Sequence, residues 1–255
     1  MSDQHFANVV LGLSFDGVDG ATAVTDWSGA PHAMTFNGNA QLDTAQFKWG
    51  TASLLCDGNA DFVTTPDHAD WSFGSSPFTV EGWLRFNHLN TAEDGCALCG
   101  HYNNTGNQRS WALYYDNSTG EDLTFIRSSD GTATTALKGA WPGGSPALNT
   151  WFHVAADRDA NNTLRVYLNG VVLASEAIST FSFHNSTDVL SIGRLNSSAG
   201  SRRWLNGWLD ELRITKGVAR YAGAFNPPGG PFSRYKALGA ARNARPANIG
   251  FALAA

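Results

Sequence analysis

Residues 204–221 read WLNGWLDELRITKGVARY, a long strand-like run near the end of a chain of 255 residues. Side chains of a β-strand alternate between its two faces. The two predicted faces are Trp208, Asp210, Leu212 and Ile214 on one side, and Leu209, Glu211 and Arg213 on the other. Asp210 therefore shares a face with apolar side chains. A carboxylate there is costly unless something compensates it, so the stretch predicts a specific partner for Asp210.

Strand-like runs separated by turn residues recur along most of the chain. They cover residues 9–15, 33–37, 52–56, 61–65, 78–86, 109–115, 123–128, 150–157, 163–170, 189–194 and 207–215. No stretch has the pattern of a long amphipathic helix, and only 15% of the residues are charged. This number and spacing of short strands predict an all-β fold, a two-sheet antiparallel sandwich or jelly roll.

Two runs show the alternation most clearly. FTVEGWLRF (78–86) and TLRVYLNG (163–170) place apolar side chains at every second position, so we expect half-solvated strands. Asn169-Gly170 lies between TLRVYL and VVLA. This pair predicts a two-residue β-hairpin, because a type I′ turn needs positive φ at both central positions.

The end of the chain differs in composition from the rest. Seven basic residues and no acidic residue follow position 212, and Pro and Gly at 227–231 precede an Ala-rich tail. We therefore expect one domain over residues 1–232 and a basic C-terminal arm over 233–255. Without clustered aromatic residues or a nucleic-acid-binding motif, the basic residues are weak evidence for nucleic-acid binding. An arm that lies on an acidic neighbouring subunit explains them as well. The N-terminus has neither a secretory signal nor an apolar run long enough to span a membrane.

The three cysteines are too few for a disulfide scaffold. Cys96 and Cys99 form a CxxC pattern, but a zinc site would need two more ligands of suitable spacing. The seven histidines form no ligand-spaced pair. The sequence therefore favours small apolar cysteines in or beside a strand.

Three segments together resemble laminin G-like domains of the concanavalin A-like lectin/glucanase superfamily. The first is LSFDGVDGATAVTDWSG (13–29) followed by KWGTASLLCDGNADFVTTPDHADWSFGSSPFTVEGWLRF (48–86). The second is NTWFHVAADRDANNTLRVYLNGVVLAS (149–175). The third is LSIGR (190–194) with WLNGWLDELRITKGVARY and FNPP (225–228). Its ITKGVARY motif is most similar to the versions of this domain in tailed-bacteriophage virion proteins. The resemblance covers about residues 8 to 232 and implies a jelly roll with a role in binding or assembly.

Calcium often accompanies this fold, and the Gly-rich stretch from Asp16 to Asp26 carries oxygen ligands on a loop that can bend around an ion. The resemblance places the family's metal position on Asp26, and with it Asp16 and Asp210. Asp210 would then close a cation site joining the last strand to the first. The alternative is that Asp210 accepts backbone N–H bonds or pairs with an arginine, while Asp16 and Asp26 cap turns.

Glycan binding needs exposed aromatic faces and planar polar groups on loops. Trp27, Tyr102, Trp141 and Trp204 are the candidate glycan-binding residues, although tryptophan in a sandwich more often packs in the core. Catalysis is not expected, because glycosidases need two carboxylates facing one sugar. Asp210 and Glu211 are adjacent and predicted on opposite faces.

The sequence therefore predicts a non-enzymatic phage virion protein, a decoration or tail-fibre component with a lectin-like domain for glycan attachment. Its predicted partners are other virion proteins, bound through the C-terminal arm, and host-surface or environmental glycans; a homo-oligomer is also compatible. Its predicted location is the particle surface. The alternative is a bacterial secreted carbohydrate-binding or adhesion module, which would be extracellular.

Overall fold

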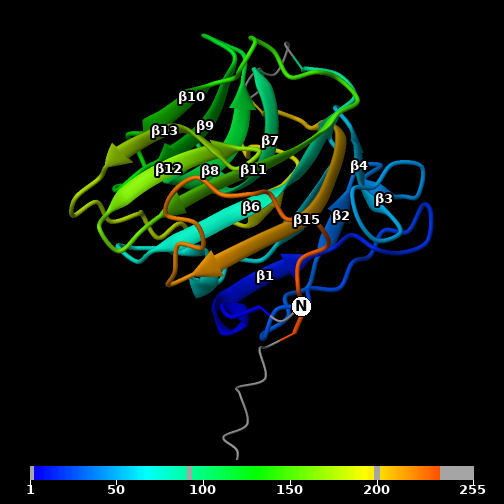
Figure 1. Ribbon diagram of the computed structural model, residues 1–255, viewed down its shortest axis with the longest axis horizontal. Coiled ribbons are helices and arrows are strands. Elements are labelled where there is room, and N and C mark those ends of the chain that lie inside the picture. Colours follow the sequence, from blue (N-terminus) through cyan, green and yellow to red (C-terminus); the bar gives the residue numbers. More distant parts are fainter. Residues whose placement is uncertain (1–2, 91–93, 198–201, 236–255) are drawn as a thin grey trace, which may run out of the picture.

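The computed structural model describes residues 3–90, 94–197 and 202–235, which form a sandwich of two antiparallel sheets (Figure 1). The strands of the larger sheet are β1 (Val9–Leu13), β3 (Gln41–Asp43), β4 (Ser53–Asp57), β6 (Phe78–Phe86), β11 (Trp151–Arg158), β12 (Thr163–Leu168), β13 (Val171–Ala177) and β15 (Asn206–Lys216). Their order is β13-β12-β11-β6-β15-β4-β3, and β1 also pairs with β15. The predicted two-sheet antiparallel fold is confirmed.

The smaller sheet lies behind the first in Figure 1. Its strands are β2 (Thr35–Asn37), β5 (Phe62–Thr65), β7 (Gly95–Asn103), β8 (Gln108–Asp116), β9 (Asp122–Arg127), β10 (Thr135–Ala140) and β14 (Leu190–Ile192). Their order is β10-β9-β8-β7-β14-β5-β2. The helices of the described residues are two 3-10 turns, η1 (Phe6–Asn8) and η2 (Ala69–Trp71), and neither is long enough to cross a membrane.

The core fills the space between the sheets with large aromatic side chains. The ring of Phe73 stacks on Phe78 at 4.2 Å and on Trp111 at 4.8 Å. Cys96 and Cys99 are free thiols buried in β7, as the apolar interpretation predicted. β7 itself was missed, since it is buried along most of its length and shows no alternation between polar and apolar residues.

A β-bulge in β15 reverses the predicted alternation of side chains. Asp210 lies opposite Trp83 of β6, but Arg213 lies opposite Glu81, so one extra residue of β15 is accommodated between these pairs. Glu211 lies in the bulge and has a φ of 50°. This is the left-handed conformation that such an insertion commonly uses.

The bulge places Asp210 on the outer face of the larger sheet. Leu212 and Ile214 belong to the core between the sheets, whereas Asp210 pairs with Trp83, which lies outside that core. The prediction that Asp210 shares a face with Leu212 and Ile214 is therefore wrong. The two-residue period holds on each side of Glu211 but not across it.

The segment that follows β15 covers part of this outer face, crossing in front of β6 in Figure 1. Ala222 donates its N–H to Asp157 of β11, and Phe225 donates its N–H to the carbonyl of Gly170. β6 is consequently buried on both faces, so the prediction that it is half-solvated is wrong. The Asn169-Gly170 turn is confirmed, with φ values of 48° and 80°.

A buried ionic network fastens this covering segment to the sheet. Glu81 accepts hydrogen bonds from Arg213, at 2.7 and 3.0 Å, and from the hydroxyl of Tyr221. His153 lies 3.2 Å from the same carboxylate, and Asp3 lies 3.4 Å from Arg213. Burial raises the pKa of Glu81, but Arg213 and His153 outweigh burial and hold it well below its usual range. The network joins the N-terminus, β6, β11 and β15.

Candidate binding surface

Asp210 anchors the loop between β3 and β4. Its Oδ2 atom accepts the backbone N–H groups of Lys48 at 2.8 Å and Trp49 at 3.0 Å. The side chain is fully buried, and Oδ1 has no hydrogen-bond partner. Burial raises the pKa of the Asp210 carboxyl to about 7, although the two N–H bonds oppose that shift.

Asp16 anchors the same loop at its other end. Its Oδ1 atom accepts the N–H of Thr51 at 2.7 Å, and its Oδ2 atom accepts a hydrogen bond from Arg234 at 2.7 Å. Gly50, with a φ of 74°, brings the backbone so close that a Cβ atom there would lie 1.9 Å from Asp16 Oδ1. Residues 44–51 are therefore fixed at two points by two aspartates.

The loop carries Phe47 and Trp49, and the Trp49 ring lies beside that of Trp83 in β6. We call this set, Phe47, Trp49, Trp83, Arg85 and Trp208, the tryptophan surface. Phe47 is 43% exposed, and Trp49 and Trp208 are half-buried. The ring centroids of Trp49 and Trp83 lie 6.4 Å apart, and the Arg85 guanidinium lies 5.1 Å from the Trp208 ring.

Planar polar groups border these rings. Arg85 donates to the side-chain oxygens of Gln46 at 3.1 Å and Asn149 at 2.9 Å. Trp208 donates its indole N–H to Asp43 at 2.5 Å. The hydrogen bonds to Gln46 and Asn149 fix the Arg85 guanidinium beside the Trp208 indole. Aromatic faces combined with oriented amide and guanidinium groups can stack on a sugar ring and bond its hydroxyls.

The four predicted glycan-binding residues lie elsewhere, and the structure does not bring them together. Trp141 is 5% exposed and packs in the core against Phe86 and Phe152. Tyr102 and Trp204 are each 7% exposed. These three rings are therefore too buried to offer an open face to a ligand.

The remaining candidate, Trp27, is half-buried and lies over Gly12 of β1. A Cβ atom on Gly12 would lie 2.4 Å from the Trp27 ring. The ring of Phe6 stacks on the Trp27 ring, with ring centroids 6.3 Å apart. The Trp27 ring covers the face of β1 at Gly12, and its role in glycan binding stays a prediction.

The predicted calcium ligands are not brought together as one ligand group. Asp26 accepts four hydrogen bonds, from the N–H groups of Gly12, Ser28 and His32 and from the Ser28 hydroxyl, each at 2.9 Å. A carboxylate has about four lone-pair sites, so these donors occupy the sites that calcium would need. Calcium binding at Asp16, Asp26 and Asp210 stays a prediction that rests on the resemblance.

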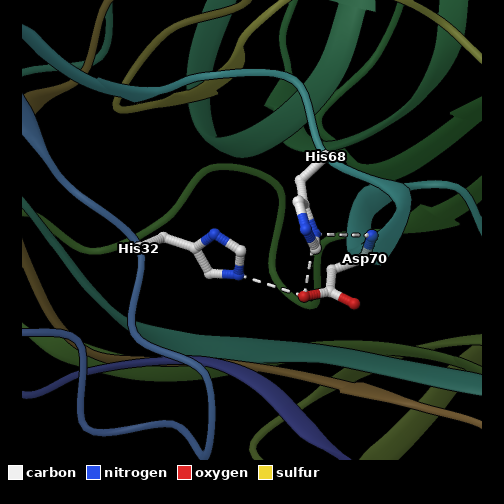
Figure 2. Close-up of side chains that lie close together, drawn as sticks. All are labelled: His32, His68 and Asp70. Carbon is white, nitrogen blue, oxygen red and sulfur yellow. Dashed lines mark hydrogen bonds and ion pairs between the residues drawn. The ribbon is translucent and has the colours of Figure 1, made fainter.

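The structure instead brings together three ligands that the sequence analysis missed. His32 Nε2 and His68 Nδ1 each lie 3.0 Å from Oδ2 of Asp70 (Figure 2). In the described part of the chain, this is the one group of three or more His, Cys, Asp or Glu side chains placed to hold an ion. The two histidines are far apart in sequence, so no local spacing could have indicated the pair.

Comparison with solved structures shows the same fold in several binding domains. The binding domain of Paraclostridial Mosquitocidal Protein 1 matches with a TM-score of 0.65 and 15% identity, over 86% of this chain and 51% of that one. The binding domain of botulinum neurotoxin serotype G matches with a TM-score of 0.62 and 16% identity, over 83% and 49%. The chain thus spans about half the length of these toxin domains.

A third match has nearly the same length as this chain's sandwich. It is domain 4 of AbnA, a GH43 extracellular arabinanase from Geobacillus stearothermophilus, solved in complex with arabinotriose. The TM-score is 0.58 and the identity 21%, over 83% of this chain and 93% of that domain. No curated protein matches the sequence. The family model described as the concanavalin A-like lectin/glucanases superfamily matches residues 57–220, and the chain therefore belongs to this superfamily.

Proposed function

We propose that this chain is a non-enzymatic, lectin-like binding domain that attaches to glycans through the tryptophan surface. One observation carries the proposal: a buried and a half-buried aspartate fix residues 44–51, so that Trp49 is held beside Trp83 of β6, where Arg85 lies over the neighbouring Trp208. A preorganised aromatic surface loses little conformational entropy when it binds a ligand.

The fold comparisons support a binding role. One similar domain was solved with arabinotriose, and others are toxin binding domains. The carboxylates of this chain also argue against glycoside hydrolysis. Asp210 and Glu211 are both almost completely buried, and each accepts backbone N–H groups, so neither faces an open groove where a sugar could be cleaved.

Glycan-array binding of the purified chain tests this proposal. Phe47→Ala and Trp208→Ala should each abolish most of the saturable signal, since stacking contacts of this kind contribute about 1–3 kcal/mol each. Val171→Ala is the matched control, because Val171 is an exposed apolar residue at the β12–β13 turn, outside the tryptophan surface. Glycan binding that survives both aromatic substitutions would refute the assignment of this surface.

The proposed setting is a tailed-phage particle, in which the sandwich faces outward as a decoration or tail-fibre component. Two features support this setting: the resemblance of the ITKGVARY motif (214–221) to phage virion proteins, and the basic arm. The predicted arm spans 233–255, and residues 236–255 of it lie outside the described residues. Its predicted partners are other virion proteins.

Particle assembly tests the phage setting. The chain should purify with particles at a fixed stoichiometry, and deletion of residues 233–255 should abolish its incorporation. Full incorporation of the truncated chain would refute the role of the arm. Recovery of the chain from culture medium without particles would instead favour the alternative, a bacterial secreted carbohydrate-binding or adhesion module, for which the arabinotriose-bound relative is the supporting observation.

A further inference from the structure

We propose that His32, His68 and Asp70 bind one divalent transition-metal ion, with Zn²⁺ as the best match. The three side chains come from two segments: His32 from the loop between β1 and β2, and His68 and Asp70 from the turn around η2 (Figure 2). All three ligand atoms lie within 4.8 Å of one another. This inference is independent of the proposed glycan binding.

The donor set determines the class of ion. Two imidazole nitrogens and one carboxylate oxygen form a three-ligand set that zinc commonly uses in proteins. Calcium and magnesium prefer sites built of oxygen atoms alone. The cluster is therefore suited to Zn²⁺ or to a neighbouring first-row ion such as Co²⁺.

The distances also suit a small ion. Tetrahedral zinc with bonds of about 2.0–2.2 Å holds its ligand atoms roughly 3.3–3.5 Å apart. The two histidine nitrogens lie 3.0 Å from the Asp70 oxygen. To admit the ion, each histidine–carboxylate distance must open by about 0.3–0.5 Å, and the two imidazole nitrogens, which lie within 4.8 Å of each other, must adopt the same ligand spacing. Rotation of the half-exposed His68 side chain can supply this movement.

The Nδ1 atom of His68 makes two competing contacts. Its Nδ1 atom faces a donor, the backbone N–H of Asp70 at 3.3 Å, and an acceptor, Asp70 Oδ2 at 3.0 Å. A single tautomer of the imidazole can satisfy only one of these contacts. An ion placed between the three side chains accepts a lone pair from each of them at the same time.

Two ligands are held by rigid surroundings, as a preorganised metal site requires. The backbone N–H of His32 donates to Asp26, whose carboxylate is fixed by three further hydrogen bonds. The His32 ring lies 4.6 Å from the ring of Trp71, which is fully buried and follows Asp70 directly. Asp26, predicted as a metal ligand, thus acts here as a positioning residue for His32.

The site is open to solvent on one side. The side chain of His68 is 51% exposed, whereas those of His32 and Asp70 are 12% and 23% exposed. An ion can therefore enter past His68. Three protein ligands leave a fourth position for water or for a donor group of another molecule.

Isothermal titration of the full-length, untagged chain with ZnCl₂ after EDTA treatment tests the proposal. One equivalent of Zn²⁺ should bind, and Co²⁺ should give the visible absorption of a tetrahedral complex. His68→Ala should abolish saturable binding, and Asp70→Asn should weaken it at least about tenfold. His88→Ala is the matched control, because His88 is an exposed histidine outside the cluster, and this variant should bind as the wild type does.

Since His68 is half-exposed, His68→Ala should melt at the wild-type temperature in EDTA, which separates lost binding from lost folding. Absence of saturable Zn²⁺ and Co²⁺ binding would overturn the proposal. Wild-type affinity in both His32→Ala and His68→Ala would also overturn it. Preferential binding of Ca²⁺ or Mg²⁺ would refute the assigned class of ion.

Discussion

Replacing Asp210 with asparagine tests whether a buried carboxyl group makes this fold less stable as the pH rises. Burial raises the pKa of Asp210 from 3.8 to about 7 in the folded chain. The folded state therefore holds this proton more tightly than the unfolded chain does. The stabilisation is fully present below about pH 4 and is lost as the pH rises through about 7.

The size of the effect follows from the shift in pKa. Each pKa unit corresponds to about 1.4 kcal/mol, so a shift of about 3 units amounts to about 4 kcal/mol over the whole range. Of this, about 2.5 kcal/mol is lost between pH 5 and pH 8. Burial also raises the pKa of Glu211 to about 7. This second carboxyl group lowers the stability further as the pH rises, by the same amount in the wild type and in the Asp210 variant.

Asp210→Asn removes the titrating group and keeps an oxygen that can accept the N–H groups of Lys48 and Trp49. Urea unfolding, followed by tryptophan fluorescence in EDTA, should show that the variant loses about 2.5 kcal/mol less than the wild type between pH 5 and pH 8. Asp130→Asn is the control, because the backbone N–H of Thr132 and its neighbours lower the pKa of this exposed carboxyl to about 2. It stays ionised throughout the range, so its replacement should leave the pH profile unchanged.

Equal pH profiles for the wild type and Asp210→Asn would refute the reasoning. The same series with millimolar calcium tests the calcium prediction as well. An ion bound to the Asp210 carboxylate would raise the stability of the wild type at pH 8 and leave Asp210→Asn unaffected. Identical wild-type curves with and without calcium would exclude such an ion.

Three further substitutions test other parts of the fold. Glu81→Gln leaves the buried guanidinium of Arg213 without its main counter-charge and should cost about 3–5 kcal/mol in urea unfolding; a loss below about 1 kcal/mol would contradict the role of the network. Gly170→Ala should lower the melting temperature, because its Cβ would lie 1.9 Å from the carbonyl oxygen of Phe225; an unchanged melt would mean that the turn does not hold the covering segment. Trp141→Ala should cost about 3–5 kcal/mol as a core truncation, and glycan binding by the folded variant should persist; specific loss of binding would restore Trp141 as a ligand contact.

The sequence predicts the sandwich well because strand patterning is a local property. The run at 78–86 matches β6 in both bounds, and the Asn169-Gly170 turn has the positive φ values that its residues favour. Most other strands were predicted within two residues. β3 and β10 were missed, since short or Gly-containing segments carry too few alternating positions for the pattern to be read.

The features that fix the candidate sites depend on contacts between distant residues. One left-handed residue, Glu211, moves Asp210 from the predicted inner face to the outer face, and a count of alternating positions cannot detect it. The burial of both faces of β6 depends on a segment more than 130 residues later. His32 and His68 meet only because their two loops meet in the fold.

The aspartates of this chain illustrate how the surroundings of a carboxylate decide its chemistry. Asp26 accepts four hydrogen bonds from N–H and O–H donors, and Oδ2 of Asp210 accepts two from backbone N–H groups, so that each carboxylate fixes a loop. Asp70 is met by two imidazole nitrogens, which can offer lone pairs of their own. A carboxylate that accepts hydrogen bonds from several backbone N–H groups therefore fixes a loop. A carboxylate that lies beside imidazole nitrogens can instead bind an ion together with them. Because all these residues carry the same side chain, only the groups that face it separate the two roles.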